Sequence, residues 1–92
     1  MLKILSWRGK FYNTILQRGQ NYFNRGYVEN FKIINDTEIR ADVKGDRVYK
    51  VRILLSNNGS IKAMSCDCPF SLDGNYCKHE VAVLLEYEAQ FR

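Results

Sequence analysis

The stretch SCDCPFSLDGNYCKHE, residues 65–80, contains every cysteine of this chain and its single histidine. These four residues form two closely spaced pairs, Cys66-x-Cys68 and Cys77-x-His79, with eight residues between the pairs. Thiolate sulfur and imidazole nitrogen are ligands that Zn²⁺ prefers, and four of them complete a closed tetrahedral site. The pattern therefore predicts one structural Zn²⁺ ion held by Cys66, Cys68, Cys77 and His79.

The spacing within the stretch indicates how the chain could present these ligands. Residues i and i+2 at the end of a strand project to the same side, so Cys66 and Cys68 can face one point. Pro69 cannot donate to a sheet ladder and is expected to end that strand, and the turn-forming residues 71–75 can fold the chain back. The second pair is expected in the first turn of a helix, where the positive end of the helix dipole favours thiolates.

Other uses of these residues explain the pattern less well. A disulfide between Cys66 and Cys68 would close a strained ring. Pairing either one with Cys77 would leave a thiol over and His79 without a role. Burial of cysteine as a small apolar residue is common, but it does not explain why the cysteines and the histidine form two pairs, each separated by one residue. An iron–sulfur cluster usually takes four cysteines.

Catalysis is not expected from this site. A catalytic zinc keeps an open position, whereas four local ligands close the shell and use every candidate thiolate nucleophile. Asp67, between two ligands, is expected to point away from them, and Glu80 is expected to act electrostatically at the start of the last helix. Because the sequence holds no phosphate-binding loop or Ser-His-Asp set, we expect the chain not to be an enzyme.

Length, charge and cysteine usage indicate the class of protein. With 92 residues the chain is expected to form one domain, 1–92, whose small core favours recruitment of a metal. The net charge of +4 mildly favours anionic partners. We find no apolar run long enough for a membrane span, no signal-peptide pattern at the N-terminus and an odd number of cysteines. A cytoplasmic location is therefore expected.

Hydrophobic periodicity predicts an α+β fold that begins and ends with helices. Apolar side chains recur at helical spacing over residues 8–25, within a helical N-terminal region 1–26. Gly19 occupies the missing apolar position and allows two short helices instead of one. Residues 77–90 are rich in helix formers and predict a C-terminal helix on the sheet. The core-packing side chains would be Tyr12, Ile15, Leu16, Tyr22 and Phe23 in the first helix, and Val81, Ala82, Leu84 and Leu85 in the last.

Between the helices, residues 27–65 show an apolar period of two, which predicts β-strands. Short turns such as Asn35-Asp36 favour a four-stranded antiparallel β-meander. The strands are expected at 28–34, 37–43, 47–56 and 60–66. The buried side chains of the two central strands would be Ile39, Ala41, Val43, Tyr49, Val51, Ile53 and Leu55. The zinc site, 66–79, would then join the end of the sheet to the last helix.

The ligand pattern resembles the SWIM zinc finger, whose signature is CxC, a variable gap and CxH. The segments CPF (68–70) and CKHEVAVLL (77–85) resemble the family's CP-aromatic and CKH-apolar helix. Upstream, RGQNYFNRGYV (18–28) and ADVKGDRVYKVRI (41–53) resemble the region before the finger in bacterial SWIM proteins, many of which are SWI/SNF-type helicase-like ATPases. The resemblance covers roughly residues 18–87 and implies a targeting domain of a larger ATPase, because this chain has no ATPase motif of its own.

Basic side chains supply the second candidate site. SWIM fingers are proposed to bind DNA or proteins, and several cations here alternate with apolar residues of the expected strands, so they could track phosphates without reading bases. The candidate nucleic-acid-binding residues are Arg40, Lys44, Arg47, Lys50, Arg52, Lys62 and Lys78. We expect a nucleic-acid partner, DNA in the first place, and neither a small-molecule substrate nor a membrane. The alternatives are a solvated face balanced by acidic residues, and a zinc-stabilised protein–protein interaction module.

Overall fold

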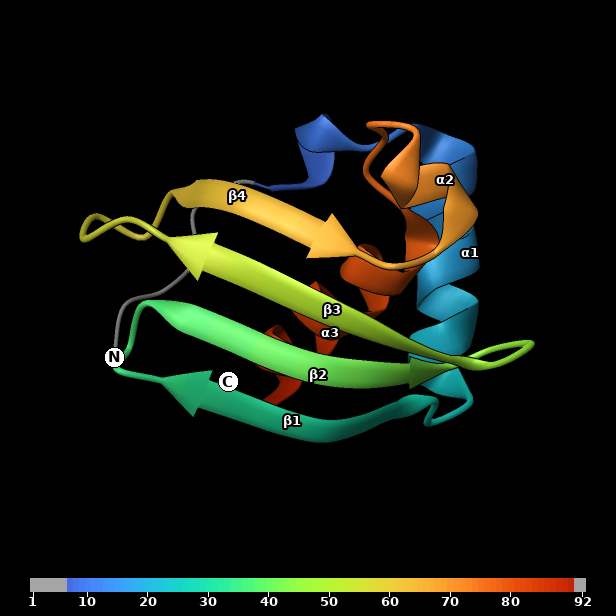
Figure 1. Cartoon of the computed structure of the whole chain (residues 1–92), viewed down its shortest axis with the longest axis horizontal. Helices are drawn as coiled ribbons and strands as arrows, with labels where there is room; N and C mark the ends of the chain where they lie inside the picture. The colour runs from blue at the N-terminus through green and yellow to red at the C-terminus, as the bar shows by residue number, and fades with distance from the viewer. Residues whose placement is uncertain (1–6, 91–92) are drawn as a thin grey trace.

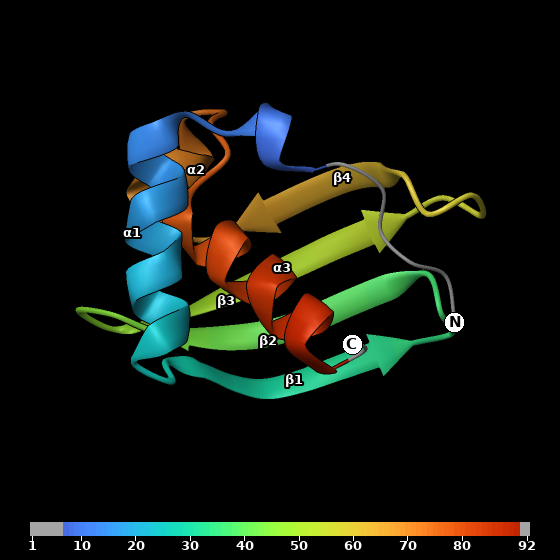
Figure 2. The ribbon, with the colours of Figure 1, turned by 180° about the vertical axis from the view of Figure 1, so that it is seen from behind.

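A four-stranded antiparallel sheet carries one long helix against one of its faces, and a second helix crosses the end of the strands on the same side (Figures 1 and 2). The computed structural model describes residues 7–90. Its elements are a 3₁₀ turn (Arg8–Lys10), α1 (Asn13–Asn24), β1 (Val28–Ile34), β2 (Glu38–Lys44), β3 (Val48–Leu55), β4 (Ile61–Cys66), α2 (Pro69–Leu72) and α3 (Lys78–Gln90). The predicted α+β class, with helix, antiparallel meander and final helix in that order, is confirmed.

The sheet has the order β1-β2-β3-β4, so each strand pairs with its neighbour in the sequence. Asn35 and Asp36 join the first two strands with φ of 54° and 60°, the left-handed conformation that a tight two-residue hairpin turn requires. The pairing shifts between Glu29 and Lys32, where Asn30 has a φ of 53°. A second shift lies between Leu54 and Leu55. Each strand lies within one residue of its predicted bounds.

The inner face of the sheet and α3 together form the core. Alternate residues of β2 and β3 are buried, as their period of two predicted. Along α3, every residue from His79 to Leu85 is buried, because the sheet covers one side of this helix and α1 covers another (Figure 2). The four apolar residues predicted for the last helix, Val81, Ala82, Leu84 and Leu85, are all in this core.

The first helix begins later than its periodicity predicted. Phe11 and Tyr12 are in extended conformation and separate the 3₁₀ turn from α1. Tyr12 is therefore 77% exposed rather than packed in the core, and the neighbouring Phe11 is buried instead. The remaining apolar residues of α1 follow the prediction, since Ile15 is buried and the others are partly buried against the core. None of the helices within residues 7–90 is long and apolar enough to cross a membrane.

Trp7 anchors the start of the described chain to the last helix. Its side chain is 1% exposed, and its Nε1 donates a hydrogen bond of 3.0 Å to Oε2 of Glu88. The Arg8 guanidinium donates to both oxygens of the same carboxylate, at 3.2 and 2.9 Å. No periodic pattern in the sequence predicts this contact, because its partners are 81 residues apart.

Candidate metal centre

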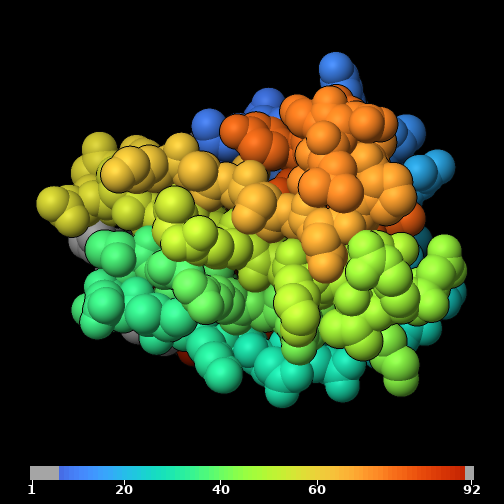
Figure 3. All heavy atoms as spheres, viewed as in Figure 1, coloured from blue at the N-terminus to red at the C-terminus, as the bar shows by residue number. Residues whose placement is uncertain are grey.

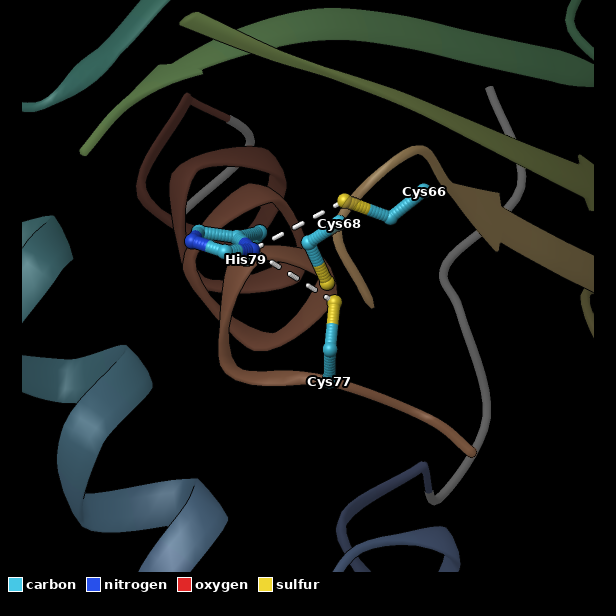
Figure 4. Close-up of side chains that lie close together, drawn as sticks. All are labelled: Cys66, Cys68, Cys77 and His79. Carbon is cyan, nitrogen blue, oxygen red and sulfur yellow. Dashed lines mark hydrogen bonds between the residues drawn. The ribbon is translucent and has the colours of Figure 1, made fainter. Parts of the chain in front are cut away.

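Three separate elements bring the four predicted ligands together. Cys66 is the last residue of β4, Cys68 precedes α2, Cys77 precedes α3, and His79 lies in the first turn of α3. Their side chains converge on one point (Figure 4), and their ligand atoms all lie within 4.8 Å of one another. All four residues are buried.

The distances between these atoms fit a tetrahedral zinc site. Nδ1 of His79 lies 3.7 Å from Sγ of Cys66 and 3.7 Å from Sγ of Cys77. Bond lengths of about 2.3 Å to sulfur and 2.0–2.1 Å to nitrogen give a tetrahedron with edges of about 3.6–3.8 Å. The three cysteines form no disulfide. The donor set thus fits one structural zinc ion, with thiolates and imidazole as its ligands.

Two tyrosine rings hold the imidazole of His79 in place. Tyr49 stacks on it at a centroid distance of 4.3 Å, and Tyr22 meets it edge-on at 5.3 Å. Nε2 is buried and has no hydrogen-bond partner among the described residues. Because the ring orientation presents Nδ1 to the sulfurs, Nδ1 is the nitrogen that would bind zinc.

Cys68 also caps the short helix α2, which was not predicted from the sequence. Its sulfur accepts a hydrogen bond of 3.4 Å from the backbone N–H of Ser71, and Pro69 occupies the first turn. Proline suits that position because its missing N–H has no helical partner there. The strand has already ended at Cys66, so Pro69 starts a helical turn rather than ending the strand. Only after this helix does Gly74, with a φ of 95°, turn the chain back.

Glu80, a buried residue, helps to cap the N-terminus of α3. Its Oε1 accepts a hydrogen bond of 2.8 Å from the backbone N–H of Cys77, which is the acidic half of a capping box. The expected electrostatic role at the helix start is thus accompanied by a direct bond. The carboxylate is fully buried, and this burial raises the pKa of Glu80 to about 7.

The thiols compete for protons. The hydrogen bond from the Cys77 thiol, followed by that from His79, lowers the pKa of Cys66 to about 5. The same pairing with Cys66, together with burial, raises the pKa of Cys77, and burial raises that of Cys68. Three buried thiolates at this spacing repel one another, and a divalent cation supplies the positive charge that lets all three ionise.

Comparison with known families agrees with this geometry. Residues 49–88 match the family model of the SWIM zinc finger. The matched segment begins at the second residue of β3, ends two residues before the end of α3 and includes all four ligands. No curated protein and no solved structure gives a significant match. The part of the predicted resemblance that lies before Tyr49, including residues 18–28, is outside the SWIM match.

Asp67 points away from the metal centre, as predicted. The backbone N–H of Lys50 donates to its Oδ1 at 2.9 Å, and Arg47 donates to its carbonyl oxygen at 2.7 Å. Asp67 therefore binds β3 just beyond the last residue of β4, and it holds Cys66 and Cys68 against the sheet.

The predicted cations of the strands lie on the face of the sheet turned away from α3, here called the outer face. Pairing places Arg40 opposite Arg52 and Lys50 opposite Asp42, and all three cations are exposed. They are not free of carboxylates. Glu38 forms ion pairs with both Arg40 and Arg52, and Asp42 lies 3.4 Å from Nζ of Lys50. The hydrogen bonds from Arg52 and Arg40 lower the pKa of Glu38.

The other four predicted cations lie around the rim of the sheet and the four metal ligands. Lys44 is exposed at the end of β2, and Lys62 is exposed at the irregularity in β4. The Arg47 guanidinium stacks over the Tyr49 ring at 4.7 Å and lies 3.6 Å from Oδ2 of Asp67. Lys78 is half-buried, with Nζ 5.3 Å from the centre of the Tyr22 ring.

Lys32 belongs with the outer-face cations, although the sequence analysis did not select it. It pairs with Arg40 across β1 and β2. The irregularity at Asn30 adds one residue to β1 and interrupts the alternation of its side chains. A strict period of two along the sequence therefore does not predict which residues of β1 face the core. Asn30 itself was the available signal, because asparagine adopts positive φ more readily than most residues. Its Nδ2 donates to Oδ2 of Asp42 at 2.8 Å.

Proposed function

We propose that this chain is a zinc-stabilised, non-catalytic module that binds nucleic acid, DNA in the first place, through the outer face of its sheet. A hollow of about 470 Å³ on that face supports the proposal. Four cations line it, and Asp42 is the single carboxylate among its lining residues. Those cations are Lys32, Arg40, Lys50 and Arg52. Basic side chains gathered on one face are the usual footprint of phosphate binding.

The ion pairs on the outer face position these cations without using all of their donors. Glu38 receives hydrogen bonds from Nε of Arg52 at 2.9 Å and from Nε of Arg40. More than half of each arginine side chain remains exposed. Lys32 forms no ion pair with any residue from 7 to 90, although its charge acts on Asp42 across the hollow. Figure 3 shows how broadly this face is open to solvent.

The wider context is part of the same proposal. The resemblance of the upstream region to bacterial SWIM proteins supports a role as the targeting domain of a larger SWI/SNF-type helicase-like ATPase in the cytoplasm. In that role the module contacts nucleic acid while the ATPase performs the chemistry. Base-specific recognition is not part of the proposal, because phosphate contacts carry no sequence information.

The test compares two doubly neutralised variants. Lys32→Gln with Lys50→Gln removes two cations of the hollow, while Lys10→Gln with Arg25→Gln removes two exposed cations elsewhere. Binding of labelled duplex and single-stranded DNA is measured by fluorescence anisotropy at two salt concentrations. The first variant should lower the slope of log K against log salt by about one unit for each lost phosphate contact. The second should change the slope little, because its cations lie away from the hollow.

Absence of binding by the wild-type protein at low salt would reject the proposal. Equal losses in both double variants would show that net charge rather than the outer face attracts the nucleic acid.

A protein–protein interaction module is the second candidate. Phe70, Leu72 and Tyr76, in the segment between Cys68 and Cys77, are 42%, 73% and 41% exposed. Several exposed apolar side chains within one short segment favour a protein partner. This function becomes the preferred one if the low-salt titration finds no nucleic-acid binding.

A further inference from the structure

A groove of about 320 Å³ opens beside the metal centre, at the small end of the range for ligand sites, roughly 300–1,000 Å³. Ile15 and Arg18 of α1 form one wall, and Pro69 and Phe70 at the start of α2 form another. Its floor includes three of the metal ligands. The groove is distinct from the hollow on the outer face, with which it shares no lining residue.

The rim of the groove combines charges with an aromatic surface. Arg18 and Lys78 lie in its lining together with Asp46, and none of the three forms an ion pair with another described residue. Zn²⁺ with three thiolates adds a net charge of −1 at the floor. The charges of Arg18 and Lys78 thus balance those of Asp46 and the zinc–thiolate group. The two cations lie at the rim, however, whereas the thiolates are buried. Phe70 is 42% exposed, so part of its ring is available to stack.

We propose that this groove binds one unstacked nucleotide of a single-stranded nucleic acid. Its phosphate would contact Arg18 and Lys78, and its base would stack on Phe70. Aromatic side chains beside basic groups are the general means by which proteins bind single strands, since every base has a stacking face. Every nucleobase also carries an N–H group that can donate a hydrogen bond to the carboxylate of Asp46. This inference rests on the proposed nucleic-acid function and specifies a single strand as its ligand.

The path between the hollow and the groove favours a nucleic acid over a peptide. Asp67 accepts from the backbone of Lys50, which lines the hollow, and its carbonyl accepts from Arg47. Arg47 follows Asp46, which lines the groove, in the turn between β2 and β3. A nucleic-acid strand whose phosphates cross the hollow would therefore pass Arg47, which is paired with Asp67, before it reaches the groove. An isolated acidic peptide would have no need of the outer face.

Phe70 and Leu72 provide a matched pair of variants. Both are exposed apolar residues of α2, but only Phe70 lines the groove. A labelled oligothymidylate and a duplex of equal length serve as probes in anisotropy titrations. Phe70→Ala should weaken oligothymidylate binding about tenfold, within the range for loss of one base stack, and should leave duplex binding unchanged. Leu72→Ala should leave both unchanged, and Arg18→Gln should lower the single-strand salt slope by about 0.7.

Two controls distinguish a binding defect from a folding defect. The zinc content and melting temperature of Phe70→Ala and Leu72→Ala should equal those of the wild type, because both side chains are exposed. If the wild type binds DNA and loses affinity with the outer-face variant, but Phe70→Ala has no effect or acts equally on the duplex, the groove proposal is wrong and the proposed function stands. If the wild type binds neither probe, both are wrong. If a Glu–Tyr copolymer binds in a Phe70-dependent way and the oligothymidylate does not, the proposal of a nucleotide ligand is wrong and the groove binds an acidic peptide.

Discussion

The imidazole of His79 takes its orientation from aromatic packing. Metal-ligating histidines usually donate their second ring nitrogen to a carboxylate, a carbonyl or a water molecule. Here Nε2 lacks such a partner among residues 7–90, and the rings of Tyr49 and Tyr22 constrain the imidazole instead. Tyr49 belongs to the sheet and Tyr22 to α1. The direction of this one ligand therefore depends on the packing of the whole core.

Loss of either ligand of the second pair should cost the protein its zinc. Cys77→Ser and His79→Ala should each purify with little zinc and lose most of the cooperative melting transition, because binding a structural zinc contributes on the order of 10 kcal/mol to folding in small finger domains. Ser71→Ala is the control from the segment between the two ligand pairs, since the backbone N–H of Ser71 donates to Cys68 and the substitution retains it. Zinc content and circular dichroism melts measure the effect. Unchanged melts in both ligand variants would contradict a structural role for the metal.

The ligands were the most predictable part of the site, whereas the groups around them were not. Four metal-binding side chains at tight spacing carry their own signal in the sequence. Arg18 and Phe70 had no such signal, because a single cation on a helix and a single aromatic in a loop are ordinary surface residues. Only the fold shows that α1 and α2 bring them to one groove.

At the scale of elements, Gly19 determines how closely α1 approaches α3. A Cβ built on Gly19 would lie 2.4 Å from Cβ of Val81 and 2.9 Å from the carbonyl oxygen of Lys78. In the sequence alone, this glycine is a weak point of a helical pattern. Its packing reason was not visible, since Val81 is 62 residues further along the chain. This close approach also sets the start of α3, with His79, beside Tyr22 of α1.

Gly19→Ala should therefore destabilise the protein even though alanine favours helices. The intrinsic preference for alanine is about 1 kcal/mol in a helix, but overpacking a tight contact costs about 1–3 kcal/mol and here involves backbone as well as side-chain atoms. We expect a net loss of about 1 kcal/mol or more in urea unfolding. Gly9→Ala is the matched control, because a Cβ there has no atom within 4 Å. A more stable Gly19→Ala protein would mean that the two helices can separate at little cost.

Elements differed in how well their sequence specified them. Strands were predicted well because each has its own alternation and is bounded by a turn such as Asn35-Asp36. The beginning of α1 was predicted less well, because Tyr12 fits the helical period but lies in the extended link before the helix. The short helix α2 was missed because four residues show no period. It depends instead on the cap that Cys68 provides.

For the molecule as a whole, the metal centre and the hydrophobic core are one unit. The ring of Trp7 meets Phe11 edge-on at 5.9 Å, and Phe11 lies 5.9 Å from the ring of Tyr76, the residue before Cys77. Trp7 also binds Glu88 near the end of α3. The chain of contacts thus runs from the first described residue through the core to a zinc ligand.

Removal of zinc should therefore unfold the protein as a whole rather than loosen one loop. Trp7 is the single tryptophan of the chain and is 1% exposed, so its fluorescence reports the part of the core beside Glu88, near the end of α3. Titration with a chelator should shift its emission to longer wavelength in step with loss of the helical circular dichroism signal, because coincident probes indicate a two-state transition. Excess Zn²⁺ should restore both signals, and Mg²⁺ should not, because it prefers oxygen ligands. A chelated protein whose Trp7 emission stays unchanged would instead have a core that is stable without its metal, and the zinc would then order only the segment from Cys66 to His79.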